Sequence, residues 1–190
     1  NEVYEVARAA EMVSEATRRF IEKGSFPKPL ISSACPAVVR LIQVRFPNLI
    51  GNILKLESPM EVAAKIIKKE VVNKNIVSPE DIGVFFITPC AAKVTSVKAP
   101  YEKARSAVDG VIAINDIFLK LTNVISGIKP ENSLEHAGFE GIRWAGSGGE
   151  SLALGNDKFL AVDGIHNVIT ILEEIEKQEN TDQPGQDKGK

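Results

Sequence analysis

The hydrophobic residues of this chain fall partly into runs typical of strands and partly into three- or four-residue spacings typical of helices. An almost unbroken apolar run extends from Ile82 to Ile87 and is bounded by turn-forming residues. This is the pattern of a strand buried on both faces of a parallel sheet. We therefore expect the run to be a central strand. Further strands are predicted over residues 30–32, 108–114 and 158–162.

Helical spacing of apolar side chains predicts that the segments between these strands are helices. The predicted helices cover residues 3–21, 36–46, 59–71, 115–125 and 163–175. Strands that alternate with helices predict an α/β fold with parallel sheets flanked by helices, and a division into two small lobes is compatible with this pattern. From Gln178 onward the sequence is polar. Residues 1–177 are therefore expected to form the folded part, and residues 178–190 a disordered polar tail.

Composition and charge narrow the possible partners and the location. A chain of 190 residues can bury a core without disulfides or metals. Its 23 basic and 25 acidic residues leave a net charge of -2 with no basic stripe, which argues against nucleic acid as a partner. No apolar run approaches the length of a membrane span, and the first residues are acidic, unlike a secretory signal. We therefore expect a cytoplasmic protein with no membrane partner.

Cys35 and Cys90 are the two cysteines of the chain, and each follows a predicted strand and adjoins a proline where the chain turns. Ligands of open α/β sheets bind outside the carboxyl ends of the strands. A thiolate at a helix N-terminus is stabilised by the helix dipole, which lowers its pKa and favours metal binding or nucleophilic attack. A free cysteine is also a small hydrophobe, so a purely structural role is the alternative. A disulfide between the two is disfavoured in a reducing cytosol.

Four stretches of the sequence resemble, in the same order, stretches of the iron-only hydrogenase family. Ser-Ser-Ala-Cys-Pro over residues 32–36 resembles the first cluster motif of that family, and Thr-Pro-Cys-Ala-Ala-Lys over residues 88–93 resembles the second. Residues 108–111 and 146–150 resemble segments that follow in the family. The resemblance extends from about Val3 to Ile175 and implies an iron-only hydrogenase-like fold.

The resemblance also implies a cofactor and a set of site residues. Cys35 and Cys90 match metal ligands of a [4Fe-4S] cluster that is joined to a two-iron subcluster. Lys93 matches a lysine that donates a hydrogen bond to a cyanide of the two-iron unit, and it is the candidate catalytic residue. The other candidate cofactor-binding residues are Ser33, Pro89, Gly148 and Gly149. The implied function is to oxidise, produce or sense molecular hydrogen, with protons and an electron-transfer protein or fused ferredoxin-like domain as partners.

The sequence departs from the pattern of that family at two places. The last motif of the family supplies two further cysteines, and this chain has only two in all. A cubane normally needs four thiolates, so the chain is expected to be an inactive central fragment that binds no cluster stably by itself. Ala34 stands where the family has a proton-relay cysteine. In this substitution the chain resembles a subgroup of the family that is proposed to sense hydrogen.

Three other interpretations remain open from the residues alone. A cluster-free scaffold or interaction module would keep the fold without the chemistry. A zinc site would need Cys35, Cys90, His136 and His166 to converge, and their spacing does not indicate this. A cysteine-dependent hydrolase would need a histidine beside one of the thiols.

Overall fold

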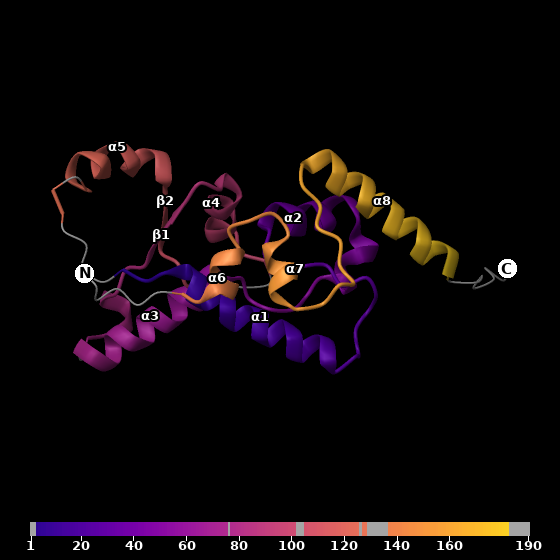
Figure 1. Ribbon diagram of the computed structural model, residues 1–190, viewed down its shortest axis with the longest axis horizontal. Coiled ribbons are helices and arrows are strands. Elements are labelled where there is room, and N and C mark those ends of the chain that lie inside the picture. Colours follow the sequence, from indigo (N-terminus) through magenta and orange to yellow (C-terminus); the bar gives the residue numbers. More distant parts are fainter. Residues whose placement is uncertain (1–2, 76, 102–104, 126, 129–136, 183–190) are drawn as a thin grey trace.

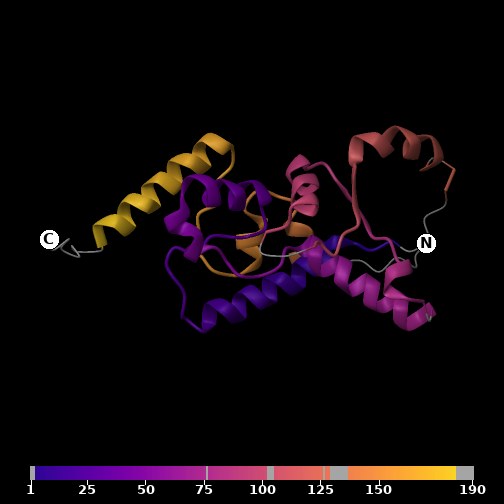
Figure 2. The same ribbon diagram turned by 180° about the vertical axis from the view of Figure 1, so that it is seen from behind.

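The computed structural model describes residues 3–75, 77–101, 105–125, 127–128 and 137–182 (Figure 1). In this part of the chain the protein is helix-rich and has one small parallel sheet, so the expected α/β class is confirmed. Figures 1 and 2 show α5 and α8 at opposite ends of the molecule, with α2, α4 and α7 between them. The elements in chain order are α1 (Val6–Glu22), α2 (Pro36–Arg45), the 3-10 helix η1 (Pro47–Asn52), α3 (Pro59–Asn75), the 3-10 helix η2 (Pro79–Asp81), β1 (Phe85–Thr88), α4 (Ala91–Lys98), β2 (Gly110–Ala113), α5 (Ile114–Ile125), α6 (Phe139–Arg143), α7 (Gly149–Ala153) and α8 (Ile165–Asp182).

The sheet consists of β1 and β2, which run parallel with Phe85 opposite Gly110. This pairing confirms the predicted parallel arrangement. The expectation that the apolar run forms a central strand buried on both faces is wrong, because Phe85 and Ile87 are 63% and 50% exposed. The alternate side chain Phe86 packs inward against Val108 and its neighbours. A strand that is covered on one face alternates in this way between inward and outward side chains.

Two other predicted strands do not form as expected. Within residues 30–32, only Ile31 pairs, through an isolated parallel bridge to Ile53. Two backbone hydrogen bonds of 2.8 Å support the bridge, from Ile31 N to the Asn52 carbonyl and from Leu54 N to the Ile31 carbonyl. Residues 158–162 are irregular and pair with no strand in the described part of the chain. Apolar content shows that a segment can pack, whereas a strand also needs a neighbour at hydrogen-bonding distance.

The predicted helices are confirmed as α1, α2, α3, α5 and α8, with shifted ends. α8 departs most, because it continues to Asp182 although the sequence predicts a polar tail over residues 178–190. Glu and Gln are good helix formers. Glu179 also accepts a hydrogen bond of 2.9 Å from Asn52 Nδ2, which ties this end of α8 to η1. Residues 183–190 lie outside the described part.

The main hydrophobic core lies where α2, η1 and α8 meet. Its buried residues are Val39, Ile42, Phe46, Leu49, Ile53 and Leu172. A second core joins α3 to the sheet, and its buried residues are Met60, Ala64 and Val108. Each large side chain that is fully buried contributes about 1.5–3 kcal/mol. The first core therefore holds α2 firmly, and with it the N-terminal end of that helix, at which Cys35 lies.

Asp109 links the start of β2 to β1 and to α3, and its replacement by asparagine is expected to destabilise this connection. Its carboxylate accepts hydrogen bonds from the Val84 amide at 2.9 Å and from Lys68 Nζ at 2.7 Å. Burial acts to raise the pKa of Asp109, but the hydrogen bonds from Lys68 and Val84 outweigh it and hold that pKa below the usual value. The carboxylate therefore stabilises the fold above the ordinary Asp pKa, and this contribution is lost as the pH falls through the folded pKa.

Urea unfolding of the Asp109→Asn variant checks this expectation. The free energy of unfolding should fall by about 1–2 kcal/mol at neutral pH, a value reduced because the Asp109 side chain is 20% exposed. The difference from the unmodified chain should shrink in acid, where the unmodified carboxyl is protonated as well. Asp157→Asn, at an exposed position, is the matched control. A deficit that is equal at neutral and acidic pH contradicts the electrostatic explanation.

Candidate functional site

Cys35 and Cys90 occupy the same local position, the N-cap of a helix. Cys35 precedes α2 with φ -96° and ψ 106°, and Cys90 precedes α4 with φ -94° and ψ 110°. The Cys90 carbonyl accepts a 3.1 Å hydrogen bond from the Lys93 amide, which closes the first turn of α4. Pro36 is the first residue of α2, where proline loses no helical hydrogen bond and its fixed φ suits the helix. The predicted setting of Cys35 at a helix N-terminus is therefore confirmed, and the structure gives Cys90 the same setting at the start of α4.

Lys93 joins the two cysteine segments, which are far apart in the sequence. Its Nζ donates a 2.8 Å hydrogen bond to the carbonyl of Ala34, the residue directly before Cys35. Burial lowers the pKa of the Lys93 ammonium, and its electrostatic interactions with Cys90 and Cys35 act in the opposite direction. Cys35 is exposed and Cys90 is partly exposed. The structure thus brings the Lys93 ammonium of the second cysteine segment into contact with the first segment and within electrostatic range of both cysteines.

Side-chain hydrogen bonds shape the two turns that lead into the site. Ser33 Oγ donates to the Leu56 carbonyl at 2.9 Å, which fixes the first turn from outside. Thr88 Oγ1 accepts from the Cys90 amide at 3.2 Å, which closes the second turn. Pro89, which lies between Thr88 and Cys90, is exposed. Ser33 and Pro89 therefore lie beside the cysteines, and the hydrogen bond of Ser33 makes it a support for the turn.

The glycine-rich segment brings an acidic side chain to the same place. Gly148 has a left-handed φ of 71°, and Gly149 begins α7 against the carbonyl of Arg143. From α7, Glu150 accepts a hydrogen bond of 2.6 Å from Ser32 Oγ. Burial raises the pKa of Glu150, while the hydrogen bond from Ser32 and the charge of Lys93 act to lower it. The two glycines thus shape the turn that presents Glu150 to the cysteine segment.

Sequence reasoning did not select Glu150 and did not predict α4. The residues after Cys90 carry scattered polar side chains, so their pattern does not indicate a helix. The one signal in the sequence for Glu150 is its position directly after the two glycines. An isolated glutamate is usually a solvated surface residue, so this signal is weak. Its partner Ser32 lies 118 positions away, so their contact depends on tertiary structure.

A cavity of about 330 Å³ lies beside the two helix N-termini. Residues of α2, of α4 and of the start of α3 line it, among them Pro36, Ala92 and Glu61. Glu61 is buried and accepts hydrogen bonds from the Ser106 hydroxyl and from the Ala107 amide, the latter at 3.0 Å. The hydrogen bonds of Glu61 thus hold one wall of this cavity in place.

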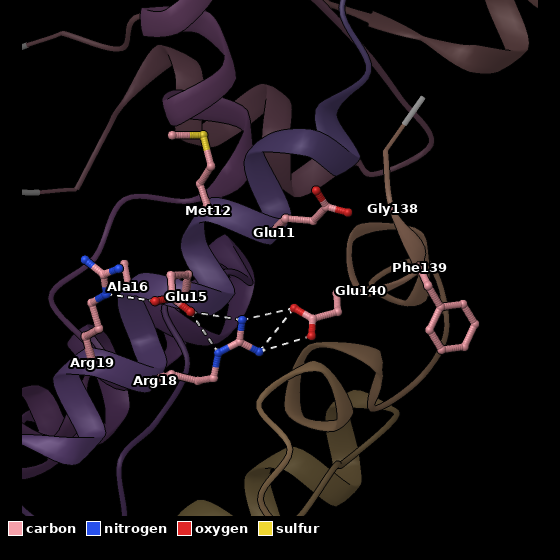
Figure 3. Close-up of a pocket in the computed structure, with 9 residues that line it drawn as sticks. All are labelled: Glu11, Met12, Glu15, Ala16, Arg18, Arg19, Gly138, Phe139 and Glu140. Carbon is pink, nitrogen blue, oxygen red and sulfur yellow. Dashed lines mark hydrogen bonds and ion pairs between the residues drawn. The ribbon is translucent and has the colours of Figure 1, made fainter. Parts of the chain in front are cut away.

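A second groove, of about 690 Å³, lies between α1 and α6 and is lined by other residues (Figure 3). Figure 3 shows the Arg18 guanidinium between the carboxylates of Glu15 and Glu140, at 3.1 Å from each. Arg18 Nη1 also donates to the Ala153 carbonyl at 2.8 Å. These contacts join α1 to α6 and α7, so we interpret the charged side of the groove as a structural joint.

The cysteines of this site would supply half of the ligands that a cubane cluster needs. Two cysteines are present in the whole sequence, whereas a cubane normally takes four thiolate ligands. In the described part of the chain, no three His, Cys, Asp or Glu side chains are grouped to hold a metal ion. His166 is exposed on α8, and His136 lies outside the described residues. The site thus offers two soft ligands and a cation, without the other ligands of a complete cluster.

Comparison with known proteins places this arrangement in a family. The profile of the family described as "Iron only hydrogenase large subunit, C-terminal domain" matches residues 1–139. One solved [FeFe]-hydrogenase, studied for oxygen inactivation through its H cluster 2Fe subcluster, shares 18% identity with a TM-score of 0.52. The match covers 90% of this chain and 42% of the solved chain. A variant of HydA1 from Chlamydomonas reinhardtii shares 21% identity with a TM-score of 0.49, over 70% of this chain and 34% of its own.

The chain therefore spans 34–42% of the length of these solved structures. At such identities, a structural likeness speaks for the fold alone, and the first of the two supports the expected iron-only hydrogenase-like fold. No helix in the described part of the chain is long and apolar enough to cross a membrane. Since the family profile covers well over half of the sequence, the chain belongs to the family of C-terminal domains of the iron-only hydrogenase large subunit.

Proposed function

We propose that this chain is the central part of an iron-only hydrogenase-like protein whose complete form binds an iron-sulfur cluster and oxidises, produces or senses molecular hydrogen. The observation that carries the proposal is the 2.8 Å hydrogen bond from Lys93 Nζ to the Ala34 carbonyl. It brings the lysine of one cysteine motif to the other motif. A cluster-free scaffold would more simply bury its thiols and turn this lysine to solvent.

The residues of this chain have distinct roles in the proposal. Cys35 and Cys90 hold the cluster as thiolates, and the amides at the starts of α2 and α4 stabilise their negative charge. Lys93 offers further ammonium donors to an anionic ligand beside the thiolates. A bound [4Fe-4S] cluster with its two-iron subcluster would supply electron storage and the hydrogen chemistry. Protons, molecular hydrogen and an electron-transfer protein or fused ferredoxin-like domain are the proposed partners, in the cytoplasm.

Two further thiolates must come from outside this sequence for a cubane to be complete. The solved structures that the chain resembles are more than twice as long as the part it covers. We therefore propose that additional polypeptide, downstream on the same gene, completes the ligand set, and that this chain alone holds no stable cluster.

Iron and acid-labile sulfide per chain, measured after anaerobic reconstitution, test this proposal. The measurement is made on this chain and on one extended into the sequence that its gene encodes downstream. We expect about four or more iron atoms per extended chain and little in the chain alone. The extended chain with Cys35→Ser or Cys90→Ser should lose most of its iron. If the extended chain holds no iron, the hydrogenase-like function is refuted and the scaffold interpretation replaces it.

A further inference from the structure

The turn before Cys35 is held from two sides by side chains of distant segments. The Ala34 amide donates to Ser32 Oγ at 3.1 Å, and the Ala34 carbonyl accepts from Lys93 Nζ at 2.8 Å. The Ser32 hydroxyl in turn donates to Glu150 Oε1 at 2.6 Å. One continuous chain of hydrogen bonds thus runs from Glu150 to Lys93 through the peptide groups next to Cys35.

α7 carries Glu150 and is itself firmly anchored. Gly149 is buried at its start, in contact with the end of α6. At its other end, the Ala153 carbonyl accepts a hydrogen bond of 2.8 Å from Arg18 of α1. Arg18 is paired with Glu140 of α6 as well. Because α7 is fixed at both ends, Glu150 is a firm anchor for the Ser32 hydroxyl.

We propose that Glu150 is a positioning residue of the cysteine site, which acts through Ser32 to fix the turn before Cys35 and so sets the placement of Cys35 relative to Cys90. The positional effect concerns the two thiols themselves. Its use in holding a cluster rests on the proposed function. Glu150 lies beyond residues 1–139, where the family profile matches, so the anchor comes from a part of this chain that the profile does not reach.

The carboxylate of Glu150 suits this task by length and charge. An ionised carboxylate is only an acceptor, so it directs the Ser32 hydroxyl to donate and leaves the Ser32 lone pairs for the Ala34 amide. A hydrogen bond to an ionised acceptor is also shorter and stronger than one between neutral groups. Aspartate is one methylene shorter and would not reach without movement of α7. Glutamine keeps one acceptor oxygen and should preserve part of the effect.

Dibromobimane, which fluoresces once it bridges two nearby thiols, measures the placement of the cysteines directly. The chain has no other cysteine, so the fluorescence reports this pair alone. Glu150→Ala and Ser32→Ala should each slow the bridging step roughly 3- to 10-fold, the effect of one lost hydrogen bond. The first alkylation of Cys90 should keep its rate. The double variant should be no slower than either single variant, because both changes break the same connection.

Two further variants make the test specific. Glu150→Gln should restore part of the bridging rate, and it keeps the test valid if Glu150→Ala fails to fold. Glu80→Ala removes another serine–glutamate hydrogen bond, the exposed pair Ser78–Glu80 at 3.2 Å, and should leave bridging unchanged. Wild-type bridging rates in Glu150→Gln and Glu150→Ala, or additive losses in the double variant, overturn the inference.

The bridging test of Glu150 and the iron-uptake test of the proposed function can fail independently. Slower bridging in the variants, together with an extended chain that takes up no iron, would sustain the positioning role and refute the hydrogenase-like function. Unchanged bridging, together with normal iron uptake, would do the reverse. A native wild-type chain that is bridged no faster than the urea-unfolded chain overturns the inference directly, because the two thiols would then not be held together.

Discussion

Dibromobimane is expected to bridge Cys35 and Cys90 in the native chain about 100-fold faster than in the chain unfolded in urea. In the unfolded chain the second bond must close a long, flexible loop, so the two thiols meet rarely. In the native chain, Cys35 and Cys90 are the N-cap residues of α2 and α4, and Lys93 bonds directly to the residue before Cys35. Fixed neighbours react with a much higher effective concentration than groups joined only by a flexible chain.

Single-cysteine variants supply the control for this measurement. Cys35→Ser and Cys90→Ser should each take up one equivalent of reagent without fluorescence, which excludes bridging between molecules at low protein concentration. Lys93→Met is the informative variant, since it keeps the length of the side chain and removes the donor to the Ala34 carbonyl. Its bridging rate should fall toward that of the Glu150 variants. Equal rates in the native and unfolded states would contradict the convergence of the two motifs.

The cysteine setting could be predicted from sequence because it depends on local rules. A proline after Cys35 and an apolar periodicity from Val38 onward are sufficient to place a helix start there, and α2 begins at Pro36. The inward direction of Lys93 could not be predicted in this way. It depends on the packing of α4 against α2, and α4 itself has almost no amphipathic pattern to reveal it.

The strands predicted over residues 82–87 and 108–114 form as β1 and β2, but the prediction that the first is a central strand failed for a different physical reason. The run from Ile82 to Ile87 shows how apolar a strand is, but not how many neighbours cover it. In the described part of the chain β1 pairs with β2 alone, and outward side chains such as Phe85 are exposed. Glu150 illustrates the same limit at the site, because its partner Ser32 belongs to a segment at the other end of the sequence. Contacts of that range come from the assembled fold and not from local pattern.

The Gly149→Ala substitution is expected to destabilise the fold by about 3 kcal/mol, a large effect for one methyl group. A Cβ at this position would overlap the backbone carbonyl of Arg143, and neither backbone can yield without separating α6 from α7. Gly149 is also buried, so no open space can receive the methyl group. The glycine proposed from sequence as a cofactor-binding residue thus has a structural task that is visible without any cofactor.

Thermal and urea unfolding measure this loss, and Gly51→Ala is the matched control. A Cβ at Gly51 would meet no atom within 4 Å, so that variant should be neutral or slightly more stable, since alanine restricts the unfolded chain. Because Glu150 follows Gly149 directly, the Gly149→Ala chain should also show slower bimane bridging under conditions where it is still folded. An unfolding midpoint equal to that of the unmodified chain would show that α7 can move away from Arg143 at little cost. Glu150 would then have no rigid support, and the anchored path from α7 to Cys35 would fail with it.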